Sequence, residues 1–173
     1  MRADEMEPSM TDVIDAVAGI AEGSYLAALR AQKPDLVRYS QGSHDVLLAP
    51  DDPGGLSLAE RTAVALRIAV LDEHAALAAH YRERLRAVGG DALLEAAERG
   101  PDPATPARIA AILDHAQRLT TAPGSATPAH LAALQAVGLA PRDVVSLSQL
   151  IAFVSYQVRL LAGLRLLAEA PQP

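Results

Sequence analysis

Apolar residues recur every three or four positions along most of this chain, which is the spacing of a helix face rather than of a strand. Between residues 13 and 48 this spacing predicts three helices. We expect Thr11 to cap the first, Ser24 to cap the second, and Pro34 to occupy the first turn of the third. The tract 49–55, which reads APDDPGG, predicts a loop.

The clearest helix start follows this loop. Ser57 and Glu60 have the S-x-x-E spacing of a capping box. From residue 63 to residue 71 every face of the expected helix is apolar except at Arg67, so we predict a helix surrounded by protein. Asp72 is expected to cap the helix that follows.

The second half of the chain also predicts helices only. They are expected over residues 91–99, 106–119, 128–137 and 141–169. Two of them begin with a Thr-Pro pair, which is a capping hydroxyl followed by a residue suited to the first helical position. The predicted fold class is therefore all-α, an array of about eight helices. We expect a single domain over 1–173, with N-terminal helices and a loop at 1–55 and the core at 56–169.

Composition agrees with closely packed helices. Hydrophobic residues make up 50% of the 173 residues, whereas aromatic residues make up only 3%. A core built from Ala, Leu, Val and Ile suits helix packing. The net charge of −6 and the few aromatic side chains exclude the basic, aromatic surface that nucleic-acid binding needs.

The most apolar tract, 144–167, is long enough to cross a membrane. Ser, Gln and Arg residues interrupt it on all sides, so we expect a core or interface helix and a homo-oligomer instead. The polar, acidic start of the chain does not resemble a secretion signal. We therefore expect a cytoplasmic protein with no membrane or nucleic-acid partner.

Three stretches carry a resemblance to a known superfamily. Residues 56–81, LSLAERTAVALRIAVLDEHAALAAHY, resemble the central helix pair of the carboxymuconolactone decarboxylase and alkylhydroperoxidase D-like (AhpD-like) superfamily. Residues 104–139 and 143–164 resemble the helices that follow and the terminal helix of many members. The resemblance implies the helical fold of that superfamily and its usual assembly into homo-oligomers.

The thiol branch of the superfamily carries a C-x-x-C pair, a Glu on the preceding helix and a His one turn after the pair. These positions correspond here to His74 and Leu77, to Thr62, and to Tyr81, and none of the residues matches. The chain contains no cysteine, and thiol peroxidase chemistry requires a thiolate. The resemblance therefore implies a non-thiol or accessory member without a cofactor, with a cysteine-bearing relative as an expected partner.

The decarboxylase branch suggests a different function. Residues 72–82, DEHAALAAHYR, are similar to a tract of that branch, with His80 and Arg82 at its His and Arg positions. This similarity implies a cofactor-independent acid–base enzyme acting on a small carboxylated or lactone substrate. His80 would be the base, and Arg67 or Arg159 would bind the substrate carboxylate.

Each candidate residue also has a structural interpretation. His80 fits a histidine packed against apolar neighbours, with a ring nitrogen bonded to a carbonyl group. His74 fits a solvated residue at a helix start. Arg67 and Arg159, each isolated in an apolar tract, fit buried arginines paired with an acid.

Glu73 and Tyr81 complete the catalytic candidates. Glu73 and His80 are seven residues apart, so we expect them on one helical stripe, where they would contact opposite ends of one small ligand. His74 and His80 would lie about 120° apart around a helix, which is poor geometry for a shared metal ion. No metal site is therefore expected.

Overall fold

The computed structural model describes residues 12–170, and this part of the chain contains no strand. Its α-helices are α1 (Val13–Ala18), α2 (Tyr25–Ala31), α3 (Pro34–Leu48), α4 (Leu58–Leu71), α5 (Ala75–Ala87), α6 (Leu94–Arg99), α7 (Ala107–Thr121), α8 (Pro128–Ala136) and α9 (Pro141–Glu169). Short 3₁₀ turns lie at Asp91–Leu93 and Pro123–Ser125. The prediction of an all-α helical array is confirmed.

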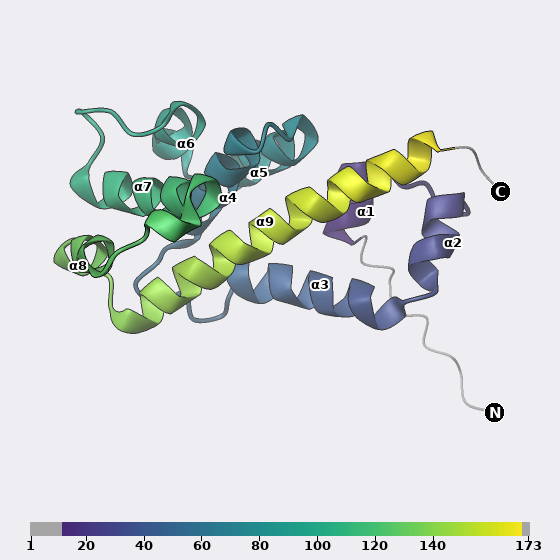
Figure 1. Ribbon diagram of the computed structural model, residues 1–173, viewed down its shortest axis with the longest axis horizontal. Coiled ribbons are helices and arrows are strands. Elements are labelled where there is room, and N and C mark those ends of the chain that lie inside the picture. The colour runs from purple at the N-terminus through teal and green to yellow at the C-terminus, as the bar shows by residue number, and fades with distance from the viewer. Residues whose placement is uncertain (1–11, 171–173) are drawn as a thin grey trace.

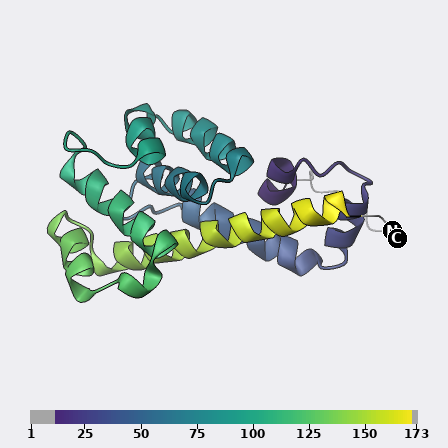
Figure 2. The ribbon, with the colours of Figure 1, turned by 45° about the horizontal axis from the view of Figure 1, so that its top comes forward.

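The longest helix, α9, runs along the whole molecule (Figure 1). Its C-terminal half lies beside α1, α2 and α3, whereas α7 and α8 lie near its N-terminal half (Figures 1 and 2). The helix α4 lies at the centre, where it packs against α5, α6, α7 and α9. The core is therefore built around α4, with α9 as its longest support.

The predicted start of α4 is confirmed. The backbone N–H of Glu60 donates to Oγ of Ser57 at 3.2 Å, and the Glu60 carboxylate accepts from the Ser57 N–H at 2.8 Å. Every residue from 60 to 69 is buried. The sequence prediction of a helix enclosed by protein is therefore correct.

Other helix starts differ from prediction. Thr11 lies outside the described residues, and Asp12 caps α1, with its carboxylate accepting from the N–H groups of Ile14 and Asp15. The helix α7 begins one residue later than predicted, because Pro106 is its cap. Thr127, in contrast, precedes α8 as expected.

The helix α9 has a buried face and an exposed face. Its buried side chains include Leu147, Leu150, Val154 and Leu161, which pack on the core. By length and composition alone α9 could cross a membrane, with a mean hydropathy of 1.5, but a third of that apolar window is buried inside the domain. The helix also packs against α1, α3, α4 and α7, which joins it to the core of the domain.

Candidate functional site

The turn between α4 and α5 holds the first candidate residue. Asp72 ends α4, and its N–H donates to the carbonyl of Ile68 at 2.9 Å. His74 is the residue that caps α5, because its Nδ1 accepts a hydrogen bond from the backbone N–H of Leu77 at 3.2 Å. The prediction that Asp72 caps this helix is therefore wrong. His74 performs the capping role that Ser, Thr, Asp or Asn usually performs.

Glu73 lies in this turn and not on α5. Its φ of 55° places it in the left-handed region, which non-glycine residues rarely adopt, and its side chain is exposed. The prediction that Glu73 and His80 share one helical stripe is therefore wrong, because α5 begins only at Ala75.

Tyr81 is fully buried, and its hydroxyl donates to Oε1 of Gln157 on α9, which is also fully buried. Burial raises the pKa of Tyr81, although the Gln157 contact and the nearby Arg84 act in the opposite direction. The phenol therefore stays protonated at physiological pH. This hydrogen bond joins α5 to α9 inside the core.

His80 lies next to His44 of α3, with 6.3 Å between the ring centroids. Nδ1 of His44 contacts a carboxylate oxygen of Asp45 at 3.0 Å, so the proton of the neutral ring belongs on Nδ1. Nε2 of His44 and Nε2 of His80 are both buried and have no hydrogen-bond partner within residues 12–170. The two rings therefore form a polar cluster whose hydrogen bonds are incomplete.

Burial, then His44 and Arg84, lower the pKa of His80 to about 4. Burial also lowers the pKa of His44, against the opposing effect of Asp45. Arg84 lies one turn after His80 and donates to the carbonyl of Leu48 at 3.2 Å. Both imidazoles are therefore neutral at pH 7, and His80 is a weak base.

Arg67 is buried but meets neutral acceptors. Nη2 donates to Oε1 of Gln117 at 2.6 Å, and Nη1 donates to the carbonyl of Glu98 at 3.1 Å. The guanidinium thus joins α4 to α6 and α7, while His80 contacts α3. No hydrogen bond or ion pair in residues 12–170 connects Arg67 to His80, and its role in carboxylate binding stays a prediction.

Arg159 lies on the exposed face of α9. Its Nη1 donates to the carbonyl of Ser155, one turn earlier on the same helix, at 2.8 Å. The prediction that Arg159 is a buried arginine is therefore wrong, because position 159 lies on the outer face of the helix. Its proposed contact with a substrate stays a prediction.

A small cavity of about 240 Å³ borders His74. Its other walls come from α1, α2, α5 and α9, and they include Val17, Leu26, Leu161 and Leu164. Such walls suit an apolar occupant and offer few partners to a polar substrate. His80 does not line this cavity.

Comparisons with known proteins identify the fold. No protein-family model matches the sequence, and no curated protein matches it. Solved structures do match, among them an uncharacterized peroxidase-related protein from Silicibacter sp. TM1040 and an alkylhydroperoxidase AhpD core protein, also peroxidase-related, from Ralstonia eutropha JMP134. The first superposes with a TM-score of 0.69 at 20% identity, covering 80% of this chain and 72% of the other. The second has a TM-score of 0.69 at 23% identity, covering 78% and 71%.

The chain has the AhpD-like fold. In this structure, the side chains at the four positions that the resemblance assigned to thiol chemistry cap a helix or pack in the core. His74 caps α5, Leu77 is in the core, and Tyr81 bonds to α9. Thr62 is fully buried, and its hydroxyl donates to the carbonyl of Leu58 on its own helix at 2.7 Å.

Two residues that contact the candidate side chains were missed by sequence analysis. His44 follows Ser40 and precedes Leu48 at four-residue intervals, and all three are buried on one face of α3. Gln157 lies on the otherwise apolar buried stripe of α9. A single polar residue within an apolar stripe was the available signal, but it does not show which residue lies opposite on another helix.

Proposed function

We propose that this protein is a non-thiol, accessory member of the AhpD-fold proteins, acting through association with other subunits and not through peroxidase chemistry. The observation that carries this proposal is the use of the four thiol-branch positions for capping and packing. His74 accepts the N–H of Leu77 in the first turn of α5, and Leu77 and Tyr81 are fully buried. With no cysteine in the chain, no residue can form the mixed disulfide that thiol peroxidases require.

Exposed apolar side chains on α3 and α9 support association. On α3 these are Leu36, Tyr39 and Val46, each more than 60% exposed. On α9 the exposed positions 145, 149, 152, 156, 159, 163 and 166 alternate in steps of four and three; they include Val145, Tyr156 and Leu166 together with the polar Gln149 and Arg159. Such spacing produces a continuous stripe that suits packing against another helix.

The two helices lie side by side (Figure 1), so their exposed side chains can meet one partner. A second copy of the chain is the partner we propose first. For any peroxidase chemistry we propose a cysteine-bearing protein of the same fold, which would supply the missing thiols.

Three exposed tyrosines allow a matched test of this surface. Tyr39→Lys and Tyr156→Lys each place a charge on a proposed stripe, whereas Tyr25→Lys places the same charge on α2. Sedimentation velocity should show that the first two variants dissociate and that Tyr25→Lys stays associated. Equal behaviour of all three variants would refute the proposed surface.

The absence of thiol chemistry has its own test. The purified chain should consume cumene hydroperoxide in the presence of dithiothreitol no faster than a protein-free control. Turnover above that control, retained after removal of host peroxidases, would contradict a non-thiol role.

The second candidate function is the acid–base enzyme with His80 as its base. Nε2 of His80 and Nε2 of His44 are buried and have no hydrogen-bond partner among residues 12–170, which favours this function, because such atoms are unfavourable unless something binds to them. The pKa of about 4 at His80 argues against it, since a general base works best near the operating pH. If a small carboxylate or lactone stabilises the wild type but not His80→Ala, the enzyme is favoured over the accessory subunit.

A further inference from the structure

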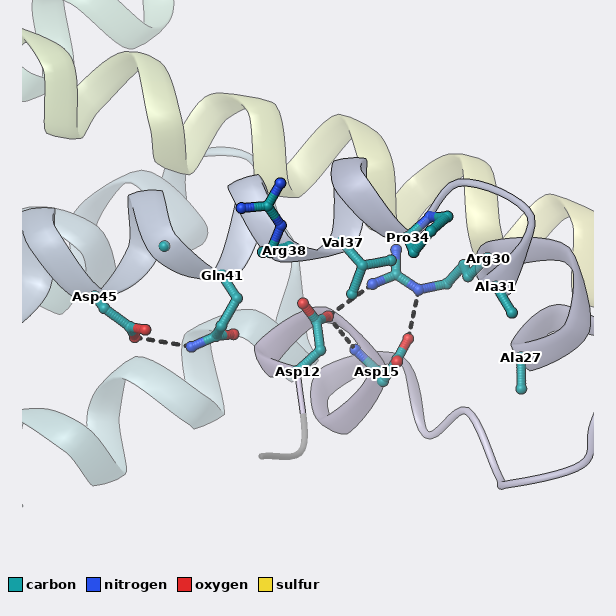
Figure 3. Close-up of a pocket in the computed structure, with 11 residues that line it drawn as sticks. Asp12, Asp15, Ala27, Arg30, Ala31, Pro34, Val37, Arg38, Gln41 and Asp45 are labelled. Atoms are coloured by element: carbon teal, nitrogen blue, oxygen red, sulfur yellow. Dashed lines mark hydrogen bonds and ion pairs between the residues drawn. The ribbon is translucent and has the colours of Figure 1, made fainter. Parts of the chain in front are cut away.

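The largest opening that we describe lies far along the chain from the α4–α5 turn. It is a cavity of about 560 Å³ between α1, α2 and the first three turns of α3 (Figure 3). Cavities of this size hold small organic ligands. The lining residues of α3 include Pro34, Val37 and Gln41, which alternate with the exposed positions Leu36 and Tyr39 around the helix.

One wall of this cavity is apolar. On this wall Ala27 and Ala31 from α2 lie together with Pro34 and Val37 from the start of α3. These side chains offer no hydrogen-bonding group, so they suit an aliphatic or other apolar segment of a ligand.

The lining near α1 and in the later part of α3 is acidic. Arg30 contacts both Asp12 and Asp15, at 2.7 Å and 2.6 Å, so one guanidinium serves two carboxylates. Asp45 accepts from the side-chain amide of Gln41 at 2.8 Å and contacts His44 at 3.0 Å, and both of these partners are neutral at pH 7. This part of the lining therefore carries more negative than positive charge.

The remaining cation on the lining does not correct this excess. Arg38 forms an exposed ion pair with Asp35 at 2.8 Å, one turn earlier on α3. Its guanidinium also lies 4.4 Å from the ring centroid of Tyr39. Arg38 is therefore matched by a carboxylate of its own.

Asp12 gives an independent sign of a missing partner. Its side chain is only 6% exposed, and Oδ1 accepts from the N–H groups of Ile14 and Asp15 and from Arg30. Oδ2 is buried and has no hydrogen-bond partner in the described part of the chain. Figure 3 shows this second oxygen turned away from Arg30, on the side of α3. A buried carboxylate oxygen without a donor is unfavourable, and a cation nearby would relieve it.

We propose that this cavity binds an organic cation, with an ammonium or guanidinium head near Asp12 and Asp15 and an apolar segment against Ala27, Ala31 and Val37. Burial raises the pKa of Asp15, Arg30 opposes this effect, and Asp12 reinforces it. The site does not depend on the proposed association, because its residues on α3 differ from the exposed apolar ones.

The test uses three probes of matched length: n-hexylammonium, hexan-1-ol and hexanoate. Calorimetric titration of the full-length protein should detect binding of hexylammonium and no binding of hexanoate, with hexanol weaker than hexylammonium. Hexanoate binding as tightly as hexylammonium, or no hexylammonium binding at millimolar concentration, would overturn the proposal.

Variants locate the site. Asp12→Asn and Asp15→Asn should weaken hexylammonium binding by about tenfold, because each removes a charge while an amide oxygen can still accept hydrogen bonds. Asp52→Asn is the control, since Asp52 is exposed and pairs with Arg142 outside the cavity. Ala31→Trp should abolish binding by filling the apolar wall with all carboxylates retained. Unchanged affinity in Asp12→Asn and Ala31→Trp would overturn the assignment to this cavity.

Discussion

The hydrogen bond between Tyr81 and Gln157 can be tested by a double-mutant cycle. Both side chains are fully buried, and Nε2 of Gln157 has no partner within residues 12–170. Tyr81→Phe removes the donor and leaves Oε1 of Gln157 without its partner, which we expect to cost about 1–3 kcal/mol. Gln157→Met leaves the Tyr81 hydroxyl unpaired, with a cost of about the same size.

The double variant shows whether the two side chains stabilise the fold as a pair. With both polar groups replaced, the loss should be smaller than the sum of the single losses, by roughly 1–3 kcal/mol. For a domain of this size, each kcal/mol corresponds to about 2–4 °C in the melting temperature. Thermal and urea unfolding monitored by circular dichroism are the appropriate measurements.

Tyr156→Phe is the matched control for this cycle. Tyr156 is 43% exposed on the outer face of α9, next to Gln157 in sequence, and loss of its hydroxyl should change stability by less than about 0.5 kcal/mol. Additive losses in the cycle, or single variants as stable as the control, would refute the interpretation of Tyr81 as a structural link.

Three further predictions concern helix capping and pH dependence. His74→Ala should lower the free energy of unfolding by about 1 kcal/mol, because it removes the group that accepts the Leu77 N–H. His74→Asn should lower it much less, because the Asn side chain can accept the same N–H. Equal losses in the two variants would contradict the capping role of His74. In the unfolded chain His80 binds a proton once the pH falls below its ordinary pKa of 6.5, whereas in the folded chain it does so only near its lowered pKa of about 4. The free energy of unfolding should therefore decrease as the pH falls from 6.5 to 4. Urea titrations of His80→Gln should show a smaller decrease over the same pH range. Burial alone would raise the pKa of Glu60, but hydrogen bonds from Arg108 and Ser57 lower it. The contribution of the Glu60 carboxylate to the free energy of unfolding should therefore be present above pH 4.5 and lost in more acidic solution. Urea titrations of Glu60→Gln should show no such loss.

The helices were predictable because each depends on neighbours in sequence. The capping box at Ser57, the Pro residues that open α3 and α9, and the apolar faces of α4 are all local signals. Helix ends were less accurate. A histidine is not among the common capping residues, so Asp72 seemed the better choice for α5.

The contacts between helices were not predictable from spacing. His80 lies beside His44, which is 36 positions earlier, and Tyr81 bonds to Gln157, which is 76 positions later. Arg67 and Arg159 looked alike in sequence, yet one is buried against Gln117 and the other is exposed. The difference depends on which face of each helix meets the core, and a long apolar tract with polar residues on several sides does not specify that face.

Sedimentation velocity of the wild-type protein at about 10 µM tests the central claim most directly. A protein that acts through association should sediment as a dimer or larger species, at a multiple of its 18.1 kDa chain mass, and Tyr156→Lys should shift it toward one chain. A single species of 18.1 kDa for the wild type at that concentration would contradict association through α3 and α9.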